Sequence, residues 1–241
     1  MSRKIMDIHN HTTWSDGVHT TEEIIENAIN NGVDIIGISD HFNTIKCNSI
    51  SIPKLHKYIE FLWKMKDKYK DKIKVLSGIE ICMNKEWCEL NNLPYNILSK
   101  LDYVLFEYID WFSDSVTLKE IQYYTKRISC PKGLAHTNIF SLIDKYEIDN
   151  VIKLIKDNEL FWELNVNEGY EYFDYIINNR NEVKIIELFN KLKENDIKIS
   201  VGSDTHALKF YDINKIKIGN ELAAESDITK LNIIKQSKIS R

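Results

Sequence analysis

The sequence predicts an α/β fold in which parallel strands form a barrel covered by helices. Short apolar runs typical of buried strands alternate along the chain with segments of helical periodicity. Only three prolines and eight glycines occur in 241 residues, so no linker divides the chain. Undivided α/β barrels commonly have about this length. We therefore expect a single domain over residues 1–241.

Seven apolar runs predict the strands, near residues 4–8, 33–38, 73–81, 102–108, 133–135, 160–166 and 197–202. Helices are expected between strands, at residues 21–31, 53–70, 116–128, 149–158 and 181–195. Thr20 or Thr21 can cap the first helix, and Gly32 can close it. Pro53 suits the first turn of the second helix. Strands that alternate with helices in this way favour a closed barrel over two half-domains.

Composition limits the classes of function. The net charge of −4 and the pI of about 6.0 disfavour a nucleic-acid partner. No apolar stretch approaches the roughly 20 residues that span a bilayer, and residues 1–4 lead into a strand rather than a signal peptide. The four cysteines form no CxxC pair, as is typical of reduced proteins. We therefore expect a cytoplasmic protein without a membrane partner.

Side chains that bind metals follow the predicted strands. His9 and His11 end the first strand, where residues two apart point to the same side. The later strands end in Asp40, His41, Glu80, His136, Asp204 and His206. Because all strands of an α/β barrel end at one rim, these side chains should converge there. The other two histidines, His19 and His56, are expected to be solvated or capping residues.

A cluster of imidazoles and carboxylates without thiolates suits Zn²⁺, Mn²⁺ or Fe²⁺. It offers more ligands than one tetrahedral ion can use, which predicts two or three divalent ions bridged by Glu80 or Asp204. Ions roughly 3.5–4 Å apart can bind phosphate oxygens and stabilise a leaving oxygen. Hydrolysis of a phosphate ester is the chemistry that follows most directly.

Five short segments form a recognisable series in the chain. They are DIHNH at 7–11 with SDG at 15–17, GISDH at 37–41, GIE at 78–80, LAH at 134–136 and GSDTH at 202–206. In this order they resemble the motifs of the PHP (polymerase and histidinol phosphatase) superfamily of metal-dependent phosphoesterases. The resemblance runs to about residue 210 and implies a distorted TIM-like (β/α)7 barrel, which agrees with the seven predicted strands.

The resemblance also implies the metal ligands. One ion would be bound by His9, His11, Glu80 and Asp204. A second would be bound by Asp16, His41 and His206, and a third would be bound in part by Glu80 and His136. Asp16 also fits a simple turn residue of its Ser-Asp-Gly segment. Asp7 and Asp40 are expected behind the ligands, where they would orient neighbouring imidazoles.

The fourth predicted strand departs from the family pattern. Where many members carry a histidine, this chain has Ile109, which cannot bind a metal. Glu107 is two residues earlier and on the same side of an extended strand, so it can take that place as a metal ligand. Asp110 can do so if the strand ends sooner. A binuclear centre, with Glu107 as an ordinary surface carboxylate, is the alternative.

Residues for substrate binding are less clearly marked. Glu163 and Asn165 end the sixth strand and can line a substrate pocket or be a structural polar pair. Arg180 is a candidate for phosphate binding, with a solvated cation as the alternative. It follows an aromatic segment that contains Tyr170, Tyr172, Phe173 and Tyr175.

These observations predict a metal-dependent phosphoesterase that acts on a small soluble phosphate monoester. Histidinol phosphate is one substrate that the resemblance implies, and nucleotide monoesters are the alternative. Two other functions are compatible with the same residues. One is a nuclease acting on nucleic-acid ends, and the other is a metal-binding regulatory protein that has lost catalysis.

Overall fold

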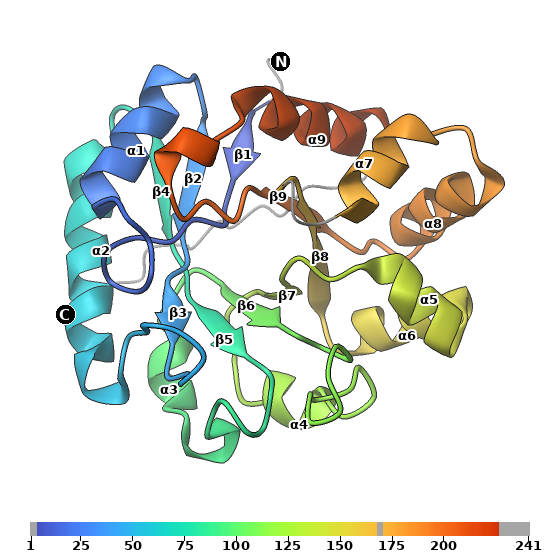
Figure 1. Ribbon diagram of the computed structural model, residues 1–241, viewed down its shortest axis with the longest axis horizontal. Coiled ribbons are helices and arrows are strands. Elements are labelled where there is room, and N and C mark those ends of the chain that lie inside the picture. The colour runs from blue at the N-terminus through green and yellow to red at the C-terminus, as the bar shows by residue number, and fades with distance from the viewer. Residues whose placement is uncertain (1–3, 168–170, 227–241) are drawn as a thin grey trace.

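The computed structural model describes residues 4–167 and 171–226 (Figure 1). Its strands form two sheets, and every pairing within them is parallel. The smaller sheet has the order β1 (Met6–Asp7), β2 (Ile35–Ile38), β4 (Lys74–Ser77). The larger has the order β3 (His41–Phe42), β5 (Glu80–Cys82), β6 (Val104–Glu107), β7 (Lys132–Leu134), β8 (Leu160–Asn165), β9 (Ile199–Gly202).

The described strands fill seven positions around a barrel. β2 continues into β3 and β4 into β5, so each of these pairs is one barrel strand with an interruption. Backbone hydrogen bonds join the two sheets there, from Gly78 N–H to Ile38 O at 2.8 Å and from Leu105 N–H to Ile79 O at 2.9 Å. On the opposite side, Ile8 N–H donates to Val201 O at 2.9 Å and brings β1 against β9. The predicted distorted TIM-like barrel is confirmed.

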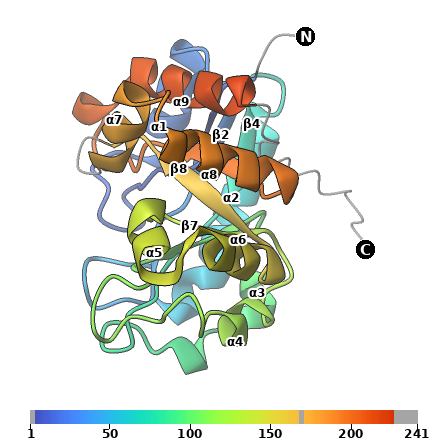
Figure 2. The same cartoon turned by 90° about the vertical axis from the view of Figure 1, so that its right-hand side faces the viewer.

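Helices surround the strands (Figures 1 and 2). They are α1 (Thr21–Asn30), α2 (Leu55–Tyr69), α3 (Tyr95–Leu98), α4 (Gln122–Thr125), α5 (Ile139–Tyr146), α6 (Ile148–Asp157), α7 (Glu171–Asn178), α8 (Val183–Glu194) and α9 (Ile213–Glu225). Short 3₁₀ turns cover Ile52–Lys54, Leu90–Asn92 and Leu208–Phe210. Figure 2 shows α5 to α9 along one side of the barrel. No described helix is long and apolar enough to cross a membrane.

Four predicted helices are confirmed and one is wrong. Thr20 caps α1 by accepting the Glu23 N–H at 3.2 Å, and Gly32 follows the helix with a φ of 75°. The expected helix at 116–128 is α-helical only over Gln122–Thr125. Val116 does not begin a helix there because its carbonyl oxygen accepts the Asp110 N–H at 3.1 Å instead of the Glu120 N–H, which donates to Thr117 O. A single domain over all 241 residues stays a prediction.

A small apolar core inside the barrel forms the floor beneath the rim. It contains Met6, Ile8, Leu76, Tyr103, Leu105, Ala135 and Phe161. The Tyr103 hydroxyl donates to Ile8 O at 2.5 Å. A Cβ at Gly37 or Gly78 would lie 2.4 Å or 2.1 Å from the Tyr103 side chain, so glycine is needed at both positions for this ring to fit. The large ring therefore fills the barrel under the polar cluster.

Candidate metal centre

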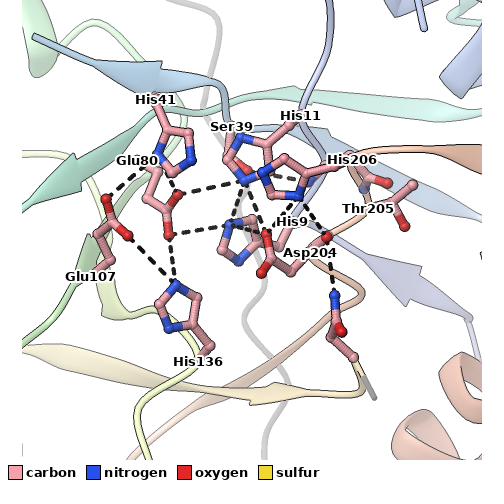
Figure 3. Close-up of polar contacts among 12 residues, drawn as sticks. His9, His11, Ser39, His41, Glu80, Glu107, His136, Asp204, Thr205 and His206 are labelled. Atoms are coloured by element: carbon pink, nitrogen blue, oxygen red, sulfur yellow. Dashed lines mark hydrogen bonds and ion pairs between the residues drawn. The ribbon is translucent and has the colours of Figure 1, made fainter. Parts of the chain in front are cut away.

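The polar residues predicted from the strand ends meet at one rim (Figure 3). The cluster comprises His9, His11, Asp16, His41, Glu80, Glu107, His136, Asp204 and His206. Their elements place them there, since each lies in, at the end of or shortly after a strand of the barrel. Asp16 and His206 are partly exposed, and the other members are buried. The convergence predicted from the barrel topology is thus observed.

The first corner of the cluster joins the two N-terminal histidines to acidic residues from distant strands. His9 Nε2 lies 3.1 Å from His11 Nε2 and 3.3 Å from Glu80 Oε1. Asp204 Oδ1 lies 3.5 Å from His9 Nε2 and 3.1 Å from His11 Nε2. These distances allow the four side chains that the family resemblance groups together to surround one ion.

The second corner is centred on Asp16 and is the more exposed. Its Oδ1 lies 3.3 Å from His206 Nε2 and 3.8 Å from His11 Nδ1, and its Oδ2 lies 3.6 Å from His41 Nε2. Histidine and carboxylate atoms from His11, Asp16, His41 and His206 lie within 4.8 Å of one another. The arrangement supports Asp16 as part of the site rather than as a turn residue alone.

The third corner contains Glu107, the carboxylate expected in place of the missing histidine. Glu107 is fully buried, with Oε1 3.5 Å from His41 Nδ1 and Oε2 3.9 Å from His136 Nε2. Glu80 lies between these histidines, 2.9 Å from His41 Nδ1 and 3.1 Å from His136 Nε2. Ile109 packs into the apolar core. Of the two carboxylates proposed for this corner, the structure brings Glu107 to the cluster.

Asp110 is held elsewhere. Its carboxylate accepts hydrogen bonds from Leu118 N–H at 2.7 Å, Lys145 Nζ at 2.7 Å and Tyr146 OH at 2.8 Å. All three partners come from the segments that follow β6 or from α5. These bonds keep Asp110 in its own polar group.

Several cluster atoms are buried without a hydrogen bond. They are His11 Nδ1, Asp16 Oδ1, His41 Nδ1, Glu80 Oε2 and Glu107 Oε1. These atoms face one another at 2.9–3.8 Å as ion pairs without hydrogen bonds, and so many ionisable atoms buried side by side need an explanation. Divalent cations provide one, because nitrogen and carboxylate oxygen are the donors that Zn²⁺, Mn²⁺ and Fe²⁺ accept. The donor set therefore fits a metal centre.

Burial and the charges of neighbouring cluster residues shift the pKa values within the cluster. Burial lowers the pKa of His9, but the carboxylates of Glu163 and Glu80 raise it further, and the resulting pKa is well above the usual value. Burial and the nearby His41 lower the pKa of His11 to about 3. For Glu80, the effect of burial is outweighed by His9 and His41, and its pKa lies well below the usual range. In the absence of ions, protons on histidines therefore balance the buried carboxylates.

Glu163 and Asn165 are buried behind the ligands. Glu163 Oε1 lies 2.8 Å from His9 Nδ1, and its Oε2 accepts the backbone N–H of His136 at 2.6 Å. Asn165 Nδ2 also donates to Glu163 Oε2, at 3.1 Å, and Asn165 Oδ1 accepts the N–H of Asn167. Both side chains are fully buried. This favours a role in positioning His9 over direct contact with substrate, and Glu163 is the carboxylate that orients an imidazole.

Asp7 and Asp40 act on different atoms from those predicted. The Asp7 carboxylate accepts from the Ser203 N–H at 3.0 Å and hydroxyl at 2.9 Å, and burial raises its pKa to about 6. Asp40 accepts from the Thr12 N–H and the Ser15 hydroxyl, both at 2.7 Å. Both lie behind the ligands as expected, but these hydrogen bonds fix loop backbone and hydroxyls rather than imidazoles. They hold the loops that carry the ligands.

The structure does not bring Arg180 to the cluster. Its guanidinium lies 3.3 Å from Glu225 at the end of α9, and the side chain is partly exposed. Of the aromatic segment before it, Tyr170 lies outside the described residues. Tyr172 is buried, and its hydroxyl accepts the Asn165 N–H at 2.9 Å. Arg180 as a phosphate ligand has no support from these contacts.

Lys46 is a residue of the site that the sequence did not indicate. It lies in the loop after β3, and its Nζ is 2.8 Å from Glu107 Oε2 and 2.9 Å from the Tyr108 hydroxyl. Burial lowers the pKa of Lys46, but Glu107 raises it further and keeps the amine charged. The two partners are 61 positions apart in the sequence, which explains why no local pattern revealed the pair.

A TIM-like barrel that carries such a cluster at its carboxyl-terminal rim has the architecture of a metal-dependent enzyme, since active sites of this fold lie at that rim. The chain belongs to the PHP domain family, whose model matches residues 7–226. The resemblance seen in the five sequence motifs is thereby confirmed.

Two curated relatives have different described roles. A DNA polymerase/3'-5' exonuclease PolX of Bacillus subtilis strain 168 is 23% identical over 219 residues. The match covers 86% of this chain but 35% of that protein, so the chain spans about a third of its length. A probable phosphatase of Acetivibrio thermocellus is 24% identical over 208 residues, covering 84% of this chain and 79% of that protein.

Solved structures confirm the fold. Histidinol phosphate phosphatase from Lactococcus lactis, crystallised with zinc, L-histidinol and phosphate, has a TM-score of 0.65 at 16% identity and covers 99% of each chain. A putative histidinol phosphatase from Listeria monocytogenes has a TM-score of 0.58 at 16% identity, covering 84% of this chain and 96% of that one. At such low identity the comparison speaks for the architecture alone.

Proposed function

We propose that this protein is a phosphatase that hydrolyses the phosphate monoester of a small metabolite with the help of divalent ions. The observation that carries the proposal is the buried cluster of five histidines and four carboxylates, several of whose atoms have no hydrogen bond. When bound, Zn²⁺, Mn²⁺ or Fe²⁺ would supply Lewis-acid stabilisation of the phosphoryl oxygens. The identity of the ions is part of the proposal.

The chain's own residues have separate tasks. His9, His11, Glu80 and Asp204 are proposed to hold one ion, and Asp16, His41 and His206 to hold another. The Glu163 carboxylate accepts a hydrogen bond from His9 Nδ1–H, which leaves the Nε2 lone pair free to face the cluster. His9, His11, His41, Glu80 and Asp204 are buried, which keeps most water away from them and strengthens their electrostatic effect on a phosphoryl group.

The space beside the cluster fits a small substrate. A hollow of about 150 Å³ borders Asp204 and His206, and Phe210 and Lys215 are part of its lining. A second hollow, of about 270 Å³, is lined by Thr137, the residue after His136, and by Trp111, but by no residue of the cluster. Both are near or below the roughly 300 Å³ at which pockets for drug-sized ligands begin. This size supports a small metabolite such as histidinol phosphate, and the Lactococcus lactis phosphatase was crystallised with L-histidinol and phosphate.

Cleavage at nucleic-acid ends is a second candidate, favoured by the match to the Bacillus polymerase/exonuclease. The net charge of −4 is against it, because a protein that follows a phosphate backbone needs a basic surface. A metal-binding protein without catalysis is the third candidate.

Substrate profiling separates these candidates. Protein reconstituted with Zn²⁺ or Mn²⁺ is tested for phosphate release from phosphorylated metabolites, including histidinol phosphate and nucleoside monophosphates, and for shortening of an end-labelled DNA strand. We expect release from one or a few small monoesters. Shortening of DNA without release from any monoester would support the nuclease, and no turnover of either would support the regulatory protein.

A further inference from the structure

The loop after β3 holds Lys46 in a defined place. Ile45 N–H donates to Trp87 O at 3.0 Å, and Asn43 N–H donates to Ile50 O at 2.8 Å. The backbone N–H of Lys46 is bonded to Thr44 Oγ1 at 3.2 Å. The loop is thus tied at several points, and Lys46 enters the cluster from a fixed backbone.

The Lys46 ammonium binds the third corner of the cluster. Besides its contacts with Glu107 and the Tyr108 hydroxyl, it lies 4.5 Å from the centre of the Tyr108 ring. That ring packs edge-on against His136, with 5.9 Å between centroids. The side chain is 23% exposed, so it is reachable from solvent. Among the described residues, two of its three N–H donors have acceptors, which leaves one for a substrate oxygen.

Glu107 is engaged on both sides. Its Oε2, the oxygen that faces His136, is bound by Lys46 at 2.8 Å. Its Oε1 lies 3.5 Å from His41 Nδ1. If His41 binds an ion through Nε2, the nitrogen that faces Asp16, then Nδ1 carries a proton and needs an acceptor. Glu80 Oε2 at 2.9 Å and Glu107 Oε1 are the acceptors in reach.

We propose that Lys46 takes the place of a third metal ion, so that the centre holds two divalent ions and the Lys46 ammonium binds a phosphoryl oxygen of the substrate. The inference deepens the proposed phosphatase function and rests on it for the substrate. In this proposal Glu107 positions Lys46, a role different from the metal ligand that the sequence predicts.

The position of the ammonium supports this assignment. Lys46 Nζ lies 2.8 Å from Glu107 Oε2, the oxygen that a third ion would share with His136 Nε2. A third divalent ion at Glu107 Oε2 and His136 Nε2 would have to sit close to the ammonium, where two like charges in a buried site repel strongly. Lys46 would have to leave its two hydrogen bonds to make room.

The test measures metal content and affinity for inorganic phosphate, so it does not depend on finding the substrate. Wild-type protein is reconstituted with Zn²⁺ or Mn²⁺, and bound metal is counted by mass spectrometry. Phosphate affinity is measured by calorimetry on the wild type, Lys46→Met and Lys46→Arg, each at two equivalents of metal. Lys66→Met is the matched control, since Lys66 pairs with Asp102 at 2.6 Å but its described contacts are outside the cluster.

We expect two equivalents of metal in the wild type. Lys46→Met should weaken phosphate binding at least about tenfold, and Lys46→Arg should keep most of it because the charge is retained. Lys66→Met should bind phosphate as the wild type does. Three equivalents in the wild type would overturn the inference, and so would unchanged phosphate affinity in Lys46→Met. The metal content of the wild type is measured without any variant, so it tests the inference even if Lys46→Met fails to fold. Failure to find a hydrolysed metabolite would count against the proposed function while leaving both of these readouts intact.

Discussion

Replacing Glu163 with glutamine tests whether the buried carboxylate behind His9 sets the metal affinity. Glu163 accepts three hydrogen bonds, from His9 Nδ1, the His136 N–H and Asn165 Nδ2. Glutamine has one acceptor oxygen and one donating amide group, so it cannot accept all three. Each orientation of the new amide fails in a different way.

With the amide oxygen toward His9, the NH₂ group meets the donors of His136 and Asn165, and a buried donor is left unpaired. That costs about 1–3 kcal/mol. With the NH₂ group toward His9, Nδ1 must become an acceptor and the proton moves to Nε2, which can then no longer bind an ion. Either outcome should weaken metal binding about 10–100-fold, which corresponds to about 1.4–2.8 kcal/mol.

Competition between the protein and a fluorescent zinc chelator measures this affinity directly. The control is Glu225→Gln, which removes a charge from the exposed ion pair with Arg180 and should leave the affinity unchanged. Circular dichroism checks that Glu163→Gln is folded. A folded Glu163→Gln protein with the affinity of the wild type would refute the role given to Glu163.

Four further outcomes are expected. His206→Ala should lower phosphatase activity by more than about 100-fold with the fold retained, since His206 is a partly exposed residue of the Asp16 corner. His56 is exposed and outside the cluster, so His56→Ala should keep the activity, and equal activity in both variants would contradict this. At a free metal concentration of about 100 times the Kd, one bound ion should add about 2.7 kcal/mol to the free energy of unfolding, so removing it should lower the Tm by about 5–11 °C. A chelator that leaves the Tm unchanged would argue against occupied sites. Metal affinity should rise with pH. Neighbouring carboxylates more than offset burial and hold the pKa of His9 and His41 well above the usual value, so binding ions must displace protons. Titration calorimetry at about pH 6 and 8 should show this proton release, and a pH-independent affinity would contradict it. Gly202→Ala should weaken metal binding because the new Cβ would lie 2.0 Å from Glu163 Oε1 and 2.6 Å from His9 Cβ. Gly219→Ala, whose Cβ would have its nearest contact at 3.1 Å, should not weaken it. Equal metal affinities in the two variants would show that the surroundings of Gly202 can adjust.

The barrel could be predicted because its strands are buried apolar runs, which stand out without any knowledge of contacts. The interruptions could not, since residues 73–81 form one apolar pattern although the strand is broken at Gly78 and Ile79. The helix expected at 116–128 failed because the carbonyl oxygen of Val116 accepts the Asp110 N–H instead of the Glu120 N–H, and helical periodicity carries no information about such bonds. Helices α3, α5, α7 and α9 were not predicted.

The cluster could be predicted because barrel topology alone brings strand ends together, as with His9 and His206. Glu163 was found at its strand end, but its partner was not, since 154 residues separate it from His9. Lys46 was missed because it lies in a loop and its role comes from a contact with Glu107 across the rim. Sequence pattern thus locates residues on elements, and the choice of partner depends on tertiary geometry.

Metal-dependent phosphate release tests the central claim most directly. Wild-type protein, the same protein after chelation and reconstituted His206→Ala are compared on a generic aryl phosphate under identical conditions. We expect saturable release by the reconstituted wild type, with at least about 100-fold less from the other two samples. Release that is equal with and without metal, or none above background from reconstituted protein on this ester and on the metabolite panel, would contradict it.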